Sequence, residues 1–207
     1  YEAGIKSSQL GGDLFISSAV YYNDASTWQE ISLLTADDGT VLSTVLINSN
    51  AAITSKGAEF EAIYKINEAL SLTAGFGYQD AVYDKNDYSE DISFAGNKVK
   101  MIPKWDSVIS TTYQWNDGWY VRVQWRSLGK TALTADNAIF RKSLNLIDAS
   151  MGYKQDNWSV RLYIDNMTNK RYAAGQAYQN FMLGTDSLYY APLAKPRTIG
   201  LKVSFKL

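Results

Sequence analysis

Apolar and polar side chains alternate along most of this chain with a period of two, the spacing that places successive residues on opposite faces of a β-strand. Between residues 157 and 166, Trp158, Leu162 and Ile164 lie on one face and the other face is polar. Residues 196–207 repeat the pattern with lysines on the polar face. Such strands need an apolar medium on one side and water on the other. The pattern therefore predicts an all-β fold, an antiparallel transmembrane β-barrel.

The same alternation, interrupted by turns rich in Gly, Asn and Asp, predicts nine strands. They cover about residues 1–8, 13–24, 53–66, 70–83, 101–115, 118–131, 143–154, 157–166 and 196–207. An antiparallel sheet with an odd number of strands does not close on itself as an ordinary bacterial barrel. An open edge in lipid would leave backbone N–H and C=O groups unpaired, at a cost of several kcal/mol each. We therefore expect the nine strands to belong to a larger barrel.

Short and long connections between the predicted strands alternate strictly. The short ones lie near Gly11, Glu68, Asp117 and Asp156, and the long ones cover residues 25–52, 84–100, 131–142 and 166–195. Outer-membrane barrels show this asymmetry, with short periplasmic turns and long outer loops. The first long connection also contains an apolar run, Val41–Asn48, which can extend the strands beyond the membrane.

Bulky aromatic residues bracket the short turns. Trp115 and Trp119 flank one turn, Tyr153 and Trp158 flank the next, and Tyr64 precedes another. Aromatic residues in such positions predict a girdle at one membrane interface. A soluble β-sandwich also has alternating strands. It explains neither the one-sided loop lengths nor tryptophans at the ends of hairpins.

Composition narrows the possible functions. The chain has 207 residues, of which 46% are hydrophobic and 20% are charged, as expected for one ordered domain. A net charge of -1 and the lack of a basic run argue against a nucleic-acid partner. The absence of Cys and His excludes thiolate and histidine metal sites and a Ser-His-Asp triad within this chain. No apolar run approaches the roughly 18 residues of a membrane-spanning helix.

Two acidic features have the residue types of catalytic or metal sites. Glu59 and Glu61 share one polar strand face, and paired carboxylates can hydrolyse glycosides. Carboxylates at alternate positions of an exposed strand are far more often a solvated surface. The acidic segment from Asp84 to Lys100 lacks the spacing of an EF-hand, so we expect a solvated loop there. We expect no enzyme activity, no cofactor and no resident metal.

Four stretches, in the same order, resemble a known family. They are Y-E-A-G-I-K (Tyr1–Lys6), S-K-G-A-E-F-E (Ser55–Glu61), D-N-M-T-N-K-R-Y (Asp165–Tyr172) and P-R-T-I-G-L-K-V-S-F (Pro196–Phe205). Together they resemble the C-terminal part of the barrel in TonB-dependent outer-membrane receptors of the siderophore-receptor type. Members of that family usually end on an aromatic residue, whereas this chain ends on Leu207 and Phe205 lies two positions earlier.

The resemblance implies that residues 1–207 are the last nine strands of a 22-strand barrel, with the plug domain and the early strands absent from this chain. It implies a receptor in the outer membrane of a Gram-negative cell that binds a ferric siderophore and imports it without chemical change. The energy would come from the TonB-ExbB-ExbD complex acting through the plug. The bilayer, lipopolysaccharide and the small-molecule ligand are the other expected partners.

Ferric siderophores are often anionic and aromatic, so we expect cations and aromatic rings near the outer opening. The expected ligand-binding residues are Trp28, Arg126, Arg141, Lys142, Tyr178, Gln179, Phe181, Tyr189 and Tyr190. Arg122 and Arg161, deeper in the wall, are expected to face the plug. The alternative is structural: inward arginines often pair with lumen carboxylates, and loop aromatics often pack one loop against another.

Other functions compete with siderophore uptake. The cargo could instead be haem, cobalamin, another metal complex or a glycan. Haem receptors often use His, which the parts of a receptor outside this chain could supply. A passive porin would need no plug, and the four matching stretches argue against it. An outer-membrane hydrolase would have to rely on carboxylate chemistry alone.

Overall fold

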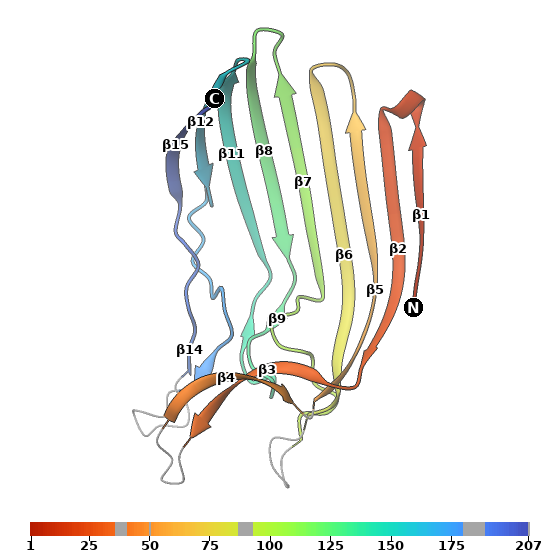
Figure 1. Ribbon diagram of the computed structural model, residues 1–207, viewed down its shortest axis with the longest axis vertical. Coiled ribbons are helices and arrows are strands. Elements are labelled where there is room, and N and C mark those ends of the chain that lie inside the picture. The colour runs from red at the N-terminus through yellow and green to blue at the C-terminus, as the bar shows by residue number, and fades with distance from the viewer. Residues whose placement is uncertain (36–40, 50, 87–92, 180–188, 207) are drawn as a thin grey trace.

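The computed structural model describes residues 1–35, 41–49, 51–86, 93–179 and 189–206. Nine strands form one curved antiparallel sheet in which most neighbours are also adjacent in sequence (Figure 1). In sheet order they are β1 (Glu2–Gln9), β2 (Leu14–Ala25), β5 (Ala52–Lys65), β6 (Leu70–Lys85), β7 (Trp105–Gln114), β8 (Trp119–Leu128), β11 (Leu144–Lys154), β12 (Trp158–Asp165) and β15 (Thr198–Phe205). The nine predicted strands and their antiparallel pairing are confirmed.

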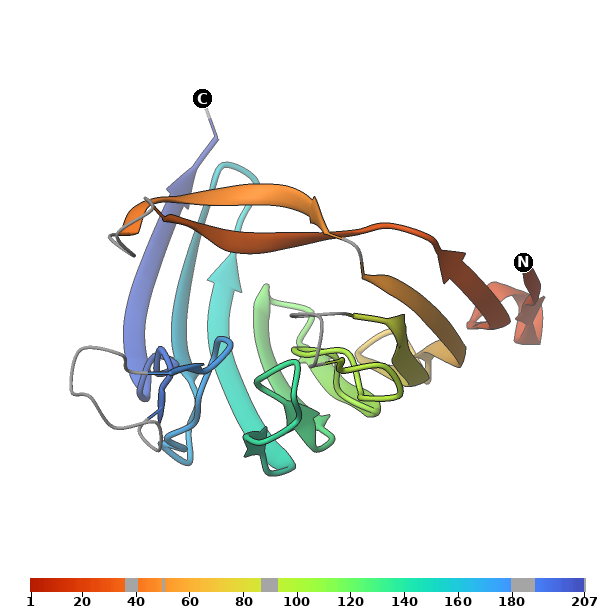
Figure 2. The same ribbon diagram turned by 90° about the horizontal axis from the view of Figure 1, so that it is seen from below.

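Three short ladders lie outside this sheet in the described part of the chain. They pair β3 (Trp28–Thr35) with β4 (Val41–Ser49), β9 (Thr131–Ala132) with β10 (Phe140–Arg141), and β13 (Tyr178–Gln179) with β14 (Tyr189–Tyr190). The run Val41–Asn48 is therefore a strand, but it pairs with β3 and does not lengthen the main sheet. Viewed from the loop end, the sheet is an arc, and the β3–β4 hairpin crosses its concave side (Figure 2).

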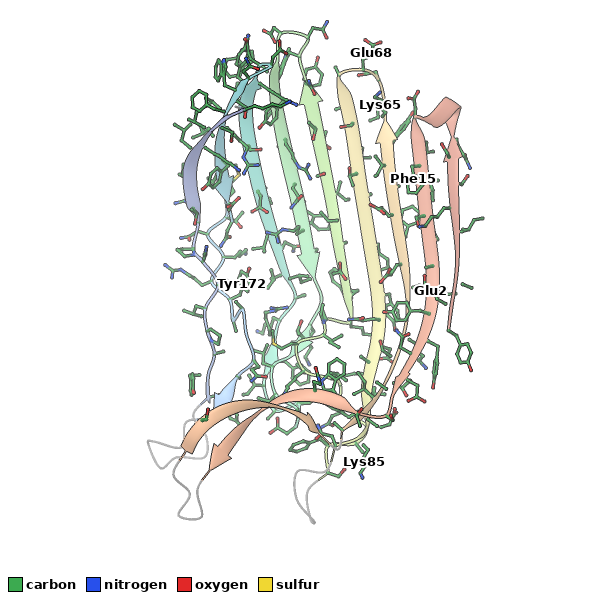
Figure 3. All side chains as sticks on the ribbon, viewed as in Figure 1. Glu2, Phe15, Lys65, Glu68, Lys85 and Tyr172 are labelled. Atoms are coloured by element: carbon green, nitrogen blue, oxygen red, sulfur yellow. The ribbon has the colours of Figure 1, made fainter. Side chains whose placement is uncertain are left out.

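The connections alternate as predicted. The short turns, including the 3-10 turn η1 (Leu10–Gly12), lie at one end of the sheet, and the long connections lie at the other. Figure 3 places Lys65 and Glu68 at the short-turn end and Lys85 at the loop end. In the turn after β5, the Asn67 side chain accepts hydrogen bonds from the backbone N–H groups of Ala69 and Leu70, at 2.9 and 2.8 Å. This capping fixes a short turn with no help from distant residues.

The strand registers align the apolar positions of neighbouring strands into continuous rows. Across five strands, for example, Tyr113, Val121, Met151, Leu162 and Leu201 face the same way. This row lies on the convex face, because the outer loops cover residues of the opposite face and lie on the concave side of the arc (Figure 2). Leu162 remains 54% exposed and Leu201 66%. A β-sandwich would bury such a row against a second sheet, so the sandwich alternative is excluded.

Tyrosines on the concave face, among them Tyr120 and Tyr163, pack over glycines of the adjacent strand. Tyr120 lies opposite Gly152, and a Cβ atom added to that glycine would be 2.6 Å from the tyrosine hydroxyl. Tyr163 covers Gly200 in the same way. A side chain at either glycine would clash with the ring, so the small residues are required for close packing of the lumen wall.

The buried apolar residues gather at the loop end, and no core runs along the sheet in its described part. Val99 and Tyr83 are almost completely buried, and Trp28 packs against the cluster that they form. The cluster consists of Ala51, Ile53, Ala81, Tyr83 and Val99, with Ala25, Trp28, Ile102 and Ala135 packed around it. Two strands are shorter than predicted beside this cluster, since β7 begins only at Trp105 and β8 ends at Leu128.

The two edge strands of the sheet have one neighbouring strand each, whereas every other strand of the sheet has two. Among the described residues, β1 pairs only with β2 and β15 pairs only with β12. Each edge therefore presents backbone groups that a further strand can pair with. The arc is a partial barrel, as the odd number of strands predicts.

In the described ranges, no helix has the length and apolar composition that a membrane-spanning helix requires.

Candidate functional site

The predicted aromatic girdle lies together at the short-turn end of the convex face. The ring centroids of Tyr153 lie 5.1 Å from Trp119 and 5.6 Å from Trp158, and those of Tyr113 and Trp115 lie 4.7 Å apart. Tyr64, near the end of β5, faces the same way opposite Leu14 and Leu72. These contacts tie neighbouring hairpins together at the level where amphipathic rings are favoured.

A second aromatic level, near the loop end of the same face, was not predicted. Tyr78 on β6 lies opposite Trp105 on β7, and both side chains face outward. Beyond this level the outward row becomes charged, with Lys56 opposite Asp80. The change from Tyr78 to Asp80 along β6 was visible in the sequence and would have located this boundary.

On the concave face, Arg126 pairs with a carboxylate. Its guanidinium donates to Asp148 Oδ2 at 2.9 Å, and the other carboxylate oxygen accepts the backbone N–H of Asn166 at 2.8 Å. Arg126 therefore lies on the lumen wall, as predicted, and helps to fix the start of the last long connection. This is the structural role that the sequence left open as an alternative.

Arg122 and Arg161 line a small polar depression of about 180 Å³ in the same wall. Arg122 donates to Ser110 Oγ and to Gln124 Oε1, both at 3.1 Å, and the guanidinium of Arg161 lies 5.3 Å from the Tyr163 ring. Neither arginine has a carboxylate partner among the described residues. Asp148 and Asp165 line the same depression, so it presents two guanidinium groups beside two carboxylates to whatever fills the lumen.

Arg141 joins two outer connections. Its guanidinium donates to the Ala173 carbonyl at 3.2 Å and to Thr131 Oγ1 at 3.0 Å. Burial lowers the pKa of Arg141 from its ordinary value, and nearby Tyr172 acts in the opposite direction. An arginine remains charged even so, and the half-buried cation is held by its hydrogen bonds. Lys142, the next residue, is exposed.

Side-chain amides form hydrogen bonds between the long connection that follows β6 and the one that follows β8. Asn137 has the positive φ of 59° and forms hydrogen bonds of 2.9 Å with both the N–H and the C=O of Lys98. Asn97 donates to the Ala135 carbonyl at 3.0 Å. The backbone N–H of Ala177, in the last connection, donates to Leu133 O at 2.9 Å. Three of the long connections thus form one hydrogen-bonded unit at the mouth.

The remaining predicted mouth residues that the structure describes lie at the same end. Tyr178 pairs with Tyr190, and Gln179 pairs with Tyr189, in the β13–β14 ladder. Phe181 lies outside the described residues. Trp28 packs against the buried apolar cluster, so part of its surface serves to hold the loops.

The N-M-T-N-K-R-Y stretch forms a turn whose side chains bond to the backbone. Asn166, at φ 51° and almost buried, accepts the N–H of Lys170 at 2.8 Å and donates to its carbonyl at 2.9 Å. Asn169 accepts the N–H of Arg197 at 3.0 Å. These bonds bring together the two ends of the last long connection and explain why Asn occurs at both positions.

The acidic residues of the wall do not form a metal site in the described part of the chain. Glu59 and Glu61 lie on the concave face, where Gly75, Gly77 and Asp106 line a shallow depression of about 260 Å³ with them. The acidic segment from Asp84 to Lys100 lies partly outside the described residues.

The family model for the TonB-dependent receptor-like β-barrel matches residues 1–167. The chain belongs to this family. The ferrioxamine B receptor of Salmonella typhimurium is 27% identical over 186 residues, in a match that covers 84% of this chain and 24% of that receptor. This TonB-dependent receptor chain thus spans about a quarter of the length of the curated relatives it matches.

Solved structures show the same fold. The ferric yersiniabactin uptake receptor of Yersinia pestis superimposes with a TM-score of 0.73 at 19% identity, covering 98% of this chain and 29% of that receptor. The siderophore receptor PiuA of Acinetobacter baumannii gives 0.72 at 22% identity, covering 99% and 28%. The nine strands of this TonB-dependent receptor chain are therefore a consecutive part of a larger barrel wall, and its family is one of outer-membrane transport receptors.

Proposed function

We propose that this chain is the C-terminal wall and outer mouth of a receptor that binds a ferric siderophore and imports it across the outer membrane. The observation that carries the proposal is a lipid-facing arc whose concave side holds cations and whose outer end is built from interlocked connections. A relative named as a ferrioxamine B receptor supports the same cargo class. The rest of a 22-strand barrel and its plug would lie in other parts of the complete polypeptide.

In this proposal the mouth residues capture the ligand. Lys142 and the β13–β14 ladder offer a cation, tyrosines and an amide, which suit an anionic chelate with aromatic groups. Arg126 and Arg141 are already hydrogen-bonded within the wall and the connections, so they would act mainly by holding the site in shape. Trp28 and Phe181 complete the proposed set.

Arg122 and Arg161 would face the plug, because their depression lies deeper in the wall than the loops and they lack carboxylate partners among the described residues. The plug would connect the receptor to the TonB-ExbB-ExbD complex, which supplies the energy. No bond of the cargo is made or broken, so the receptor would be neither an enzyme nor a cofactor protein. Its convex face would contact the bilayer and lipopolysaccharide.

Uptake of radioactive iron tests the function. The complete receptor is expressed in a Gram-negative strain that lacks its own siderophore receptors, and purified ferric siderophores, ferrioxamine B among them, are supplied one at a time under iron limitation. We expect uptake of at least one ferric siderophore, lost when TonB is deleted. Uptake that survives deletion of TonB would indicate a passive pore, and uptake of haem or cobalamin alone would assign a different cargo.

A further inference from the structure

Three lysines surround one carboxylate on the convex face, near the loop end. Lys56 lies directly across the β5–β6 pair from Asp80, and Lys98 donates a hydrogen bond to Asp80 Oδ1. The ammonium group of Lys104 also lies close enough to attract this carboxylate. All three lysines are exposed. We call Lys56, Lys98 and Lys104 the outer lysine cluster.

The cluster lies just beyond the apolar belt. Along β6 the outward positions change from Phe76 and Tyr78 to Asp80, and the Lys104 ammonium lies 5.7 Å from the centroid of the Tyr78 ring. Tyrosine rings favour the boundary between hydrocarbon and headgroups. A lysine that contacts such a ring from the loop side therefore has its charge at the depth of the lipid headgroups.

The local charges favour an anion. Three ammonium groups meet a single carboxylate at this level, which leaves an excess of positive charge. Asp24 lies one outward position farther from the belt, opposite Thr54, and Asp84 accepts a hydrogen bond from Thr54. These two carboxylates are thus displaced away from the membrane. Because the cluster lies outside the barrel, a ligand in the lumen does not explain it.

We propose that the outer lysine cluster binds a phosphate group of a lipid A-type glycolipid in the outer leaflet. The inference rests on the outer-membrane location in the proposed function, since only there does the loop end meet a leaflet of phosphorylated glycolipids. Ammonium groups form charge-assisted hydrogen bonds with phosphate oxygens. Partial exclusion of water at the headgroup level strengthens these bonds. The aromatic rings below would contact the sugar or the upper part of the acyl chains.

The test uses the complete receptor in detergent micelles, with bound lipid measured by native mass spectrometry. The probes are bisphosphorylated lipid A, lipid A without its phosphates, phosphatidylglycerol and inorganic phosphate. The variant Lys56→Gln/Lys104→Gln removes two charges and keeps the bond between Lys98 and Asp80. The matched control Lys154→Gln/Lys206→Gln removes two charges at the opposite end, on the lumen side.

We expect bisphosphorylated lipid A to bind the wild type and the control equally, and the cluster variant at least about tenfold more weakly. Equal binding to the variant, equal binding of dephosphorylated lipid A, or equally tight binding of phosphatidylglycerol would overturn the proposal. Binding of inorganic phosphate with no preference for the lipid would also overturn it. Siderophore binding is measured on the same samples. If the receptor binds lipid A but no siderophore, the result contradicts the proposed function and still supports the lipid site.

Discussion

The wall and the mouth of this chain are stabilised in different ways. In the wall, one apolar face stays half exposed and the strands are joined by backbone ladders. At the mouth, Tyr83 and Val99 are buried and side-chain amides join separate connections. The wall therefore depends on lipid to cover its apolar rows, whereas the mouth has its own small core, as a water-soluble domain does. Substitutions in the two regions should therefore destabilise the receptor for different physical reasons.

The largest effect is expected from a charge on the lipid face of the wall. Val123→Arg places a cation between the two aromatic levels, and an arginine near the middle of the bilayer costs about 2–4 kcal/mol. We expect less folded receptor in the outer membrane, measured by heat-dependent migration on gels. Thr73→Arg, on the lumen side of β6, is the matched control, and equal losses in both variants would contradict the assignment of the two faces.

A substitution at the mouth should loosen the loops and leave the barrel folded. Asn137→Ala removes the hydrogen bonds to Lys98. It also places alanine, which has no polar side chain to stabilise this conformation, at a φ of 59°. We expect the local opening free energy to fall by about 2 kcal/mol. Faster amide hydrogen exchange at Lys98 would report this.

Asn137→Gly separates the two contributions, because glycine tolerates the positive φ but cannot form the bonds. Its exchange rate should lie between those of the wild type and Asn137→Ala. Unchanged exchange in both variants would show that the amide does not hold the two connections together.

Within the wall, the stability of the lumen face should be sensitive to an increase in side-chain volume. Gly152→Ala forces a Cβ atom toward the Tyr120 hydroxyl, and overpacking of this kind costs about 1–3 kcal/mol. The urea midpoint of the reconstituted receptor should fall. In a Tyr120→Ala background the same change should cost little, and a persistent loss there would mean that the ring is not the obstacle.

The smallest effect is expected at the rim of the mouth. Lys142 is exposed, so Lys142→Gln should leave stability unchanged and slow the association of an anionic siderophore by about two- to fivefold at low salt. Stopped-flow fluorescence at two salt concentrations measures this. Lys206→Gln, at the short-turn end of the sheet, is the control and should not change the association rate. If Lys142→Gln slows association equally at both salt concentrations, Lys142 contacts the siderophore directly instead of steering it.

The positions of the nine strands could be predicted because alternation and turn residues are local signals. The register that aligns Met151 with Leu162 is set across a short turn, in which the Gln155 N–H donates to the Trp158 carbonyl. The partners of the candidate site residues could not be predicted in this way. Arg126 contacts Asp148 and Arg141 contacts Ala173, pairs that are far apart in sequence, and the pattern does not say which residues meet.

The sequence by itself determined which face of each strand meets lipid, where the chain turns, and that nine strands require others to close a barrel. Only the tertiary structure decided that the connections after β6, β8 and β12 interlock, that β3 and β4 form a separate hairpin, and that three lysines converge on Asp80. The reason is physical. A strand's alternation is set by neighbouring residues and the medium, whereas contacts between connections depend on how the curved sheet brings distant segments together.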